Sequence, residues 1–293
     1  MARRHILALT FALLPTGMSS PAAADATRPV TIPGAREFLL PIRQGEDYRI
    51  LVYRPEGMPP PEGWPAIYTL DADRTFATMA EFVRSQGGSP ATTGVLPMVV
   101  VGIEAARDGM IRRTRDFTPP AADVAPGEGG AEAFFAFVEA TVKPTVGRLA
   151  PLDPKRQALF GHSYGGLFTL YAATAHPAAY AAYAAASPSL WWHGEAMLRT
   201  DLGPLVAARP KVLITAAEYD QADDPLTDRR DHADTLARRR MVDNARAFAA
   251  RLTDAGLPTE AVVFPGEAHG SVIPAAIARA VRVISHEFRS SAQ

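Results

Sequence analysis

A serine flanked by glycines, followed by an apolar stretch, is the segment of this sequence best suited to chemistry. In GHSYGGLFTLYA, residues 161–172, Ser163 has a glycine two positions away on either side. This G-x-S-x-G pattern occurs where a strand turns sharply into a helix and holds a serine hydroxyl out at the tip of the turn. A tight turn with an incidental serine is the alternative. The flanking segments favour the nucleophile, because 156–161 has the pattern of a strand and 165–175 that of a helix.

The glycines and the helix both have physical roles at such a turn. A Cβ atom at Gly161 or Gly165 would crowd the neighbouring chain, next to a serine whose backbone is strained. The amino end of the helix points free N–H groups at the serine, so the N–H of Tyr164 is the expected first donor to an oxyanion. The segment YTLDAD, which ends another expected strand, should supply the second donor at Ala72 or Asp73.

A serine hydroxyl needs a base at neutral pH, and the sequence has seven histidines. His269 follows the last expected strand in the polar turn GEAHGS, where a loop at the carboxyl end of the sheet would bring it to the serine. His162 is next to Ser163, but its side chain is expected to point away from the tip of the turn. His269 is therefore the predicted base for a two-step acyl transfer.

The acid that orients the base should lie between the serine and the histidine in the chain, because hydrolases with this turn order their triad that way. The expected strand 211–217 is followed by EYDQADD, which offers four carboxylates. Glu218 is nearest the strand end, where the backbone is most rigid, and it is ranked first. Asp220 is ranked second, and Asp223 and Asp224 are further alternatives.

The elements that must position these residues alternate between strand and helix. Short apolar runs predict strands at 36–42, 48–55, 64–71, 98–104, 156–161, 180–187, 211–217 and 259–265, the first two as an antiparallel pair. Helical spacing predicts helices at 75–86, 131–150 (bent or broken near Pro144), 165–175, 229–256 (one helix or two) and 271–288. This alternation predicts a single α/β domain whose mostly parallel central sheet has helices on both faces.

The composition excludes several kinds of chemistry. There is no cysteine, so disulfides, thiolate nucleophiles and Cys-ligated metals are excluded. The net charge of −1 gives no overall attraction for nucleic acid or an anionic membrane. Catalysis must then use hydroxyl, imidazole or carboxylate groups, or a metal that the last two hold. The predicted triad needs neither a metal nor a cofactor, and its partner is a small-molecule ester.

The amino terminus has the pattern of an export signal. Two arginines precede the apolar run 6–14, and PAAADA then offers cleavage after Ala24 or Ala26. The run is too short for a stable membrane anchor. Residues 1–24 are therefore predicted to be a signal peptide, exported by the general or the twin-arginine route. The domain 25–293 is predicted to be periplasmic or secreted.

A long segment rich in Arg, Asp, Pro and Gly, residues 105–130, interrupts the alternation. Loops of this length are often functional. Three of its arginines, Arg112, Arg113 and Arg115, would form a local cationic patch that pairs with anionic ligand oxygens. Surface ion pairs with the neighbouring aspartates are the alternative, and these would contribute little.

Five motifs together resemble those of bacterial siderophore esterases in the esterase-D-like group: GHSYGGLFTLYA, ASPSLWW, YTLDAD, RRTRDFTP and GEAHGSV. The resemblance extends over residues 36–288 and implies an α/β-hydrolase fold. It supports Ser163 as nucleophile and His269 as base. In such families the acid can be displaced or missing, which puts Glu218 in doubt. Many relatives have LDG where this chain has LDAD, so the oxyanion loop at Ala72 is expected to differ in detail.

The resemblance also implies a substrate. Such esterases cleave the trilactone of enterobactin-type catecholate siderophores, whose ferric forms are anionic and carry planar rings. Trp191 and Trp192 would stack on these rings or on attached sugars, although one of two adjacent tryptophans is expected in the core.

The leading interpretation is an exported serine esterase that cleaves a catecholate siderophore and so aids iron release. An exported esterase or thioesterase of the same fold that acts on another acyl or feruloyl-type ester is the alternative. A non-catalytic scaffold is a third interpretation, and the intact Ser163 and His269 argue against it.

Overall fold

The structure is a computed structural model that describes residues 29–42, 47–226, 233–259 and 261–290. The chain divides into a short first unit, Met1–Thr31, and a second unit, Ile32–Gln293, which holds every helix and strand described. The predicted signal peptide lies outside the described residues, so export stays a prediction. In the described part of the chain, no helix combines the length and the apolar character needed to cross a membrane.

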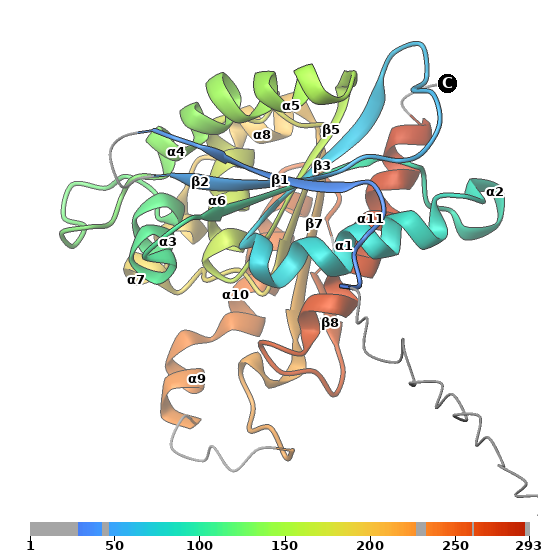
Figure 1. The fold of residues 1–293 in the computed structure, drawn as a ribbon. Helices are drawn as coiled ribbons and strands as arrows, with labels where there is room; N and C mark the ends of the chain where they lie inside the picture. The colour runs from blue at the N-terminus through green and yellow to red at the C-terminus, as the bar shows by residue number, and fades with distance from the viewer. Residues whose placement is uncertain (1–28, 43–46, 227–232, 260, 291–293) are drawn as a thin grey trace, which may run out of the picture. The chain divides into compact units, whose positions relative to one another are not determined.

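Eight strands form one sheet in the order β1-β2-β4-β3-β5-β6-β7-β8 (Figure 1). They are β1 (Ala35–Leu40), β2 (Tyr48–Tyr53), β3 (Trp64–Leu70), β4 (Val99–Ala105), β5 (Leu152–His162), β6 (Ala182–Ala186), β7 (Lys211–Ala217) and β8 (Ala261–Phe264). Strand β2 pairs antiparallel with β1 and with β4, and all other neighbours pair in parallel. The predicted mostly parallel sheet and the early antiparallel pair are confirmed.

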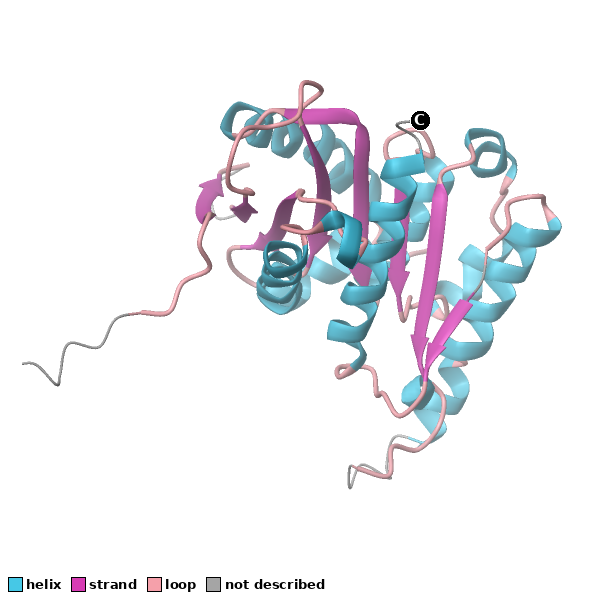
Figure 2. Cartoon of the chain, turned by 90° about the vertical axis from the view of Figure 1, so that its right-hand side faces the viewer, coloured by secondary structure: helices cyan, strands magenta, loops and turns pink. Residues whose placement is uncertain are grey.

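Helices cover both faces of the sheet (Figures 1 and 2). One face carries α1 (Ala72–Gln86) and α11 (Val272–Ser290). The other face carries α4 (Ala131–Phe137), α5 (Lys143–Leu149), α6 (Tyr164–Ala175), α8 (Gly203–Ala208) and α10 (Met241–Asp254). The remaining α-helices described are α2 (Pro90–Thr93), α3 (Gly109–Phe117), α7 (Trp192–Glu195) and α9 (Ala233–Arg239).

The strand sequences explain the two-layer core. In VVVGIEA of β4, Val99 and Val101 belong to the apolar cluster on one face and Val100 to the cluster on the other. A strand buried on both faces needs apolar residues at every position, which is the continuous run that the sequence shows. Most residues of helix α6 are buried, and its sequence is accordingly apolar on all sides, without the polar face of a surface helix.

Three predicted segments are refined by the structure. The predicted helix 131–150 is interrupted by a π-helical turn, Val138–Val142, after which α5 begins with Pro144 in its first turn. In place of the predicted helix 229–256, the described residues from 233 onward form two helices, α9 and α10, separated at Arg240, whose backbone is left-handed. The long segment 105–130 contains helix α3, which lies against α4 and α6 and was not predicted.

Candidate active site

Ser163 lies at the tip of a strained turn between β5 and α6. Its φ of 60° and ψ of −117° lie outside the conformations that a serine ordinarily adopts. A Cβ at Gly161 would come within 2.1 Å of the Gly165 carbonyl oxygen, so only glycine fits there. At Gly165 a Cβ would make only ordinary contacts, so the prediction that both glycines prevent crowding holds for Gly161 alone. Gly166 is tighter, since a Cβ would lie 3.0 Å from the Ala186 carbonyl oxygen.

A chain of hydrogen bonds leads away from the serine hydroxyl. The Oγ of Ser163 lies 3.0 Å from Nε2 of His269, and Nδ1 of His269 lies 2.6 Å from Oδ1 of Asp220. His269 follows β8, and Asp220 follows β7. Parallel strands therefore deliver all three side chains to the same edge of the sheet. The arrangement suits nucleophilic attack by Ser163 with His269 as base.

The structure corrects the ranking of the acid, because Asp220 and not Glu218 contacts His269. After β7 the chain forms a single 3₁₀ turn, Glu218–Asp220, which presents side chains two positions apart in different directions. The Oε2 of Glu218 instead accepts a hydrogen bond of 2.7 Å from the N–H of Gly266, in the loop that leads to His269. Glu218 therefore lies at the base of the histidine loop.

Asp220 is fully buried, and its remaining oxygen is held by two donors. The hydroxyl of Ser187 donates to Oδ2 at 2.5 Å, and the N–H of Ala217 donates to the same atom at 2.9 Å. Burial raises the pKa of Asp220, but the hydrogen bond and charge of His269 and these two donors outweigh it and lower the pKa overall. The carboxylate thus stays ionised next to His269.

A second serine lies beside Ser163. The Oγ of Ser189 is 3.3 Å from the Oγ of Ser163, and the N–H of Ser189 donates to the Ser163 carbonyl at 3.0 Å. Ser187 and Ser189 both come from ASPSLWW, after β6. Neither serine was predicted to have a role, although this motif was among those that carried the family resemblance.

His162 lies against His269, contrary to the expectation that its side chain points away from the turn. The ring centroids of His162 and His269 are 4.5 Å apart. Burial, and then the nearby His269, lower the pKa of His162 to about 3. His162 is therefore neutral at physiological pH and supports the His269 loop without adding charge.

The two predicted oxyanion donors each begin a helix. Tyr164 is the first residue of α6, and Ala72 is the first residue of α1. The first N–H groups of a helix have no partner within it. The two helix starts are close, because a Cβ at Gly165 would lie 3.4 Å from Oδ2 of Asp71. The left-handed residue of YTLDAD is Asp71, so Ala72 does not need the freedom of glycine.

The predicted cationic patch is not a free surface patch. Arg112 is buried, with its guanidinium over the Tyr48 ring at 4.3 Å and its Nε 3.9 Å from Asp116. The Nε of Arg115 lies 2.7 Å from Asp116. Helix α3 explains the difference, since it turns successive arginines in different directions, whereas a loop was expected. The motif arginines that were predicted to read substrate charge are thus paired with carboxylates.

Arg113 is also paired, but at the active site. Its Nε donates to Oδ1 of Asp71 at 2.7 Å, and its Nη2 donates to the His162 carbonyl oxygen at 3.2 Å. Its guanidinium lies 5.4 Å from the Tyr164 ring centroid.

As expected for two adjacent tryptophans, one of them lies in the core and the other does not. Trp192 is buried, and its Nε1 donates to Glu128 at 3.3 Å. Trp191 is partly exposed, and its ring centroid lies 5.9 Å from that of Tyr164, the residue after Ser163. The guanidinium of Arg239, from α9, lies over the Trp191 ring at 4.5 Å. Arg239 was not predicted, because nothing local in its charged helix distinguishes it from its neighbours.

Comparison with known proteins shows the family of this chain. Residues 43–270, well over half of the chain, match the Putative esterase family. The ferri-bacillibactin esterase BesA of Bacillus subtilis (strain 168) is 38% identical over 277 residues, which cover 87% of this chain and 91% of the relative. The chain belongs to this esterase family. It is a carboxylic ester hydrolase, and its predicted relationship to siderophore esterases is confirmed.

Two further relatives extend the comparison. The siderophore triacetylfusarinine C esterase of Aspergillus fumigatus is 30% identical to this esterase over 287 residues, 90% of this chain and 97% of the relative. The crystal structure of the BES protein from Bacillus cereus superposes with a TM-score of 0.74 at 28% identity, covering 88% of this chain and 97% of that one. The α/β-hydrolase fold implied by the motifs is confirmed.

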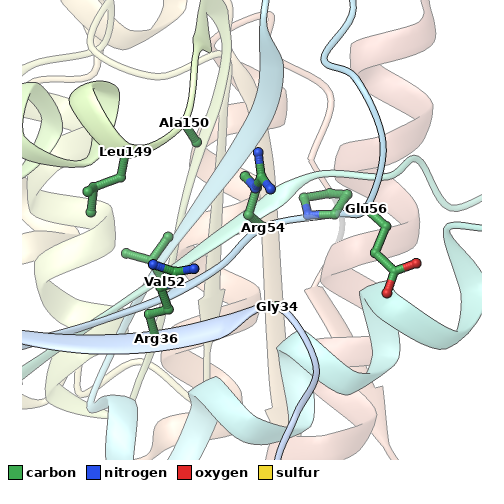
Figure 3. Close-up of a pocket in the computed structure, with 8 residues that line it drawn as sticks. Gly34, Arg36, Val52, Arg54, Glu56, Leu149 and Ala150 are labelled. Carbon is green, nitrogen blue, oxygen red and sulfur yellow. The ribbon is translucent and has the colours of Figure 1, made fainter.

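A hollow at the other end of the sheet has no part in this site. Arg36, Arg54, Leu149 and Ala150 are among the residues that line it (Figure 3). Arg54 follows β2 where that strand pairs with the start of β4, and Ala150 precedes β5. The hollow therefore lies at the amino ends of the parallel strands of the esterase, whereas Ser163 follows a carboxyl end.

The esterase shows no candidate metal centre among its described residues, since none of its histidines and carboxylates there gather in groups of three or more suited to an ion.

Proposed function

We propose that this esterase is an exported serine hydrolase that cleaves the ester bonds of a catecholate siderophore, such as an enterobactin-type trilactone, and so aids iron release. The observation that carries the proposal is the hydrogen-bonded chain Ser163–His269–Asp220. Beside it lies an aromatic wall, formed by the rings of Tyr164 and Trp191, over which the guanidinium of Arg239 is placed. Two relatives bear the names of siderophore esterases, one for ferri-bacillibactin and one for triacetylfusarinine C, which supports siderophore esters as the substrate class.

Ser163 is the nucleophile of the proposed reaction. His269 Nε2 accepts the hydroxyl proton while Oγ attacks the ester carbonyl, and Asp220 keeps the proton on Nδ1 so that Nε2 is free to act. The tetrahedral intermediate collapses when His269 returns the proton to the leaving alkoxide. Water, deprotonated by the same histidine, then releases the acyl group from Ser163.

The N–H groups of Tyr164 and Ala72 stabilise the oxyanion in this mechanism. Each is the first N–H of a helix, so it points outward and carries the positive end of the helix dipole. His269 becomes cationic when it takes the proton. Asp220, whose pKa is lowered, offsets that charge, and the neutral His162 adds no repulsion.

Recognition of the catecholate is assigned to the wall next to the nucleophile. Aromatic rings of the substrate would stack on Trp191, and Arg239 would pair with their anionic oxygens. The pairing of an arginine with anionic oxygens of the substrate was predicted for Arg112, Arg113 and Arg115. In the proposed function Arg239 takes that role. The export part of the proposal depends on the signal pattern of residues 1–24 alone. It is tested by finding the chain in the periplasm, with a mature amino terminus after Ala24 or Ala26.

The substrate class is tested by comparing kcat/KM for ferric enterobactin, iron-free enterobactin, ethyl ferulate and p-nitrophenyl acetate. The trilactone should be the best substrate by a wide margin, and comparable modest activity on all four would favour the alternative of a general esterase. Arg239→Gln should lower kcat/KM for the trilactone about tenfold and leave p-nitrophenyl acetate nearly unchanged, because one charge-assisted contact is lost. Arg238→Gln is the matched control, since its guanidinium bonds only to Thr235 among the contacts described.

A further inference from the structure

Arg113 bridges two segments of the candidate active site, the start of α1 and the turn that holds Ser163. Its Nε pairs with Asp71 at 2.7 Å, in the residue just before the predicted oxyanion donor Ala72. Its Nη2 bonds to the carbonyl of His162 at 3.2 Å, in the residue just before Ser163. One guanidinium thus ties the start of α1 to the nucleophile turn.

The carboxylate that Arg113 pairs with is set close to the reaction centre. Asp71 is buried, and its Oδ2 has no hydrogen-bond partner among the described residues. That oxygen faces the first turn of α6, 3.4 Å from where a Cβ of Gly165 would lie. An unpaired negative charge there would repel an oxyanion forming at the N–H of Tyr164, because the site is only partly screened by solvent.

The motif around Arg113 fixes helix α3 in place. The hydroxyl of Tyr48 donates to Asp116, and Arg115 pairs with the same carboxylate. The hydroxyl of Thr118 accepts a hydrogen bond from the N–H of Gly129 at 2.7 Å. Asp116 and Thr118 therefore anchor the carboxyl end of α3, so that Arg113, one turn earlier, is held against the nucleophile turn.

We infer that Arg113 is a positioning residue for the oxyanion hole, which joins its two halves and neutralises the buried Asp71 beside it. The inference deepens the proposed function, because it concerns the Ser163 mechanism, but it does not depend on the siderophore as substrate. Arg113 acts through Asp71 and the turn, without touching the ester.

The chain offers a closely matched control pair. The Nε of Arg156 lies 2.6 Å from Oδ2 of Asp153, with 16% and 7% of the two side chains exposed, against 15% and 9% for Arg113 and Asp71. Arg156 is near the start of β5 and Ser163 follows its end, so they are roughly 20 Å apart at about 3.3 Å per residue. Arg156→Ala removes an equally buried ion pair far from the reaction.

The test measures kcat and KM for p-nitrophenyl acetate and the rate at which a fluorophosphonate labels Ser163. Arg113→Ala should lower kcat and the labelling rate about ten- to a hundredfold with KM within about threefold, since the loss falls on the transition state. Arg156→Ala should change both rates less than about threefold. Arg113→Lys should recover part of the loss, because an ammonium can pair with Asp71 but cannot also span to His162.

The double variant Asp71→Asn/Arg113→Ala separates positioning from general stability. It should be at least about fivefold faster than Arg113→Ala, because it removes the uncompensated charge. Equal rates for these two variants, or an Arg113→Ala effect no larger than that of Arg156→Ala, would overturn the inference. If Arg113→Ala does not fold, an Arg113→Lys variant that is as fast as wild type would likewise overturn the inference. Wild-type protein that is not labelled at Ser163 would instead contradict the proposed function.

Discussion

At the scale of single residues, the decisive feature is which carboxylate contacts His269. Asp220 is buried and fixed by Ser187 and Ala217, whereas Glu218, two positions earlier, bonds to the backbone of Gly266. The assignment of Asp220 as the acid therefore depends on the single 3₁₀ turn Glu218–Asp220. Substitution of Asp220 and of Glu218 can test it.

Asp220→Asn should lower kcat about a thousandfold or more, because an amide cannot hold the proton on Nδ1 of His269 or stabilise the imidazolium. Glu218→Gln should change kcat less than about threefold, since an amide oxygen still accepts the hydrogen bond from Gly266. Steady-state kinetics on p-nitrophenyl acetate provide the measurement. A larger loss for Glu218→Gln than for Asp220→Asn would refute the assignment of the acid.

The residues that the sequence could predict are those specified locally. Ser163 lies within a short motif between a strand and a helix, and His269 follows the last strand, so local pattern and chain order were sufficient. Asp220 could not be separated from Glu218, because the direction of a side chain in a 3₁₀ turn depends on the loops packed around it. The orientation of His162 likewise depends on where a loop more than a hundred residues later returns.

At the scale of elements, the turn from β5 to α6 depends on one glycine. The carbonyl oxygen of Gly165 would lie 2.1 Å from a Cβ at Gly161, and this oxygen belongs to the backbone of the helix start. Neither the strand nor the helix can move away without disturbing the position of Ser163. The element is therefore intolerant of even one added methyl group.

Gly161→Ala should destabilise the fold by more than about 2 kcal/mol, or prevent folding, because backbone atoms would overlap. Gly147→Ala is the control, since a Cβ in α5 would meet nothing within 4 Å, and it should be neutral or stabilising by up to about 1 kcal/mol. Urea unfolding measures both. A Gly161→Ala protein as stable as wild type would show that the turn is less tight than described.

The alternation of strands and helices was predictable because buried parallel strands are apolar at every position, as in β4. Helix α3 was not, because two of its three buried residues, Arg112 and Asp116, are charged, so that its sequence GMIRRTRDF has the pattern of a charged loop. Arg112 and Arg113 become covered through contacts with Tyr48 and Asp71, which lie at least one strand earlier in the chain, and with Asp116 of the same helix. The roles of Arg112 and Arg113 therefore follow from tertiary packing and could not be derived from their spacing.

At the scale of the whole molecule, the buried histidine links the active site to global stability. The pKa of His162 is about 3 in the fold, against about 6.5 for an unfolded histidine, because burial disfavours its charged form. Between these values the unfolded state binds one more proton than the folded state at this residue. The contribution of His162 to the free energy of unfolding is thus fully present above pH 6.5 and is lost progressively as the pH falls toward 3.

The free energy of unfolding should therefore fall between pH 6.5 and 5, with His162 contributing up to about 1.4 kcal/mol per pH unit. His162→Gln should show a shallower dependence over the same range, whatever its stability at pH 7. Asp220, whose pKa is lowered, acts only below about pH 4, near the pKa of an unfolded aspartate, so the difference in slope between the two proteins over this window reports on the histidine. Identical slopes for the two proteins in urea titrations would exclude this role.

The most direct test of the whole account follows the cleavage of enterobactin, iron-free and ferric, by chromatography and mass spectrometry with wild type and Ser163→Ala. Wild type should open the trilactone to linear catechoyl-serine products. Ser163→Ala should do so more than about a thousandfold more slowly while keeping the same urea unfolding midpoint, because only the nucleophile is removed. A loss smaller than about a hundredfold, or a wild-type protein that hydrolyses p-nitrophenyl acetate but leaves the trilactone intact, would contradict the account.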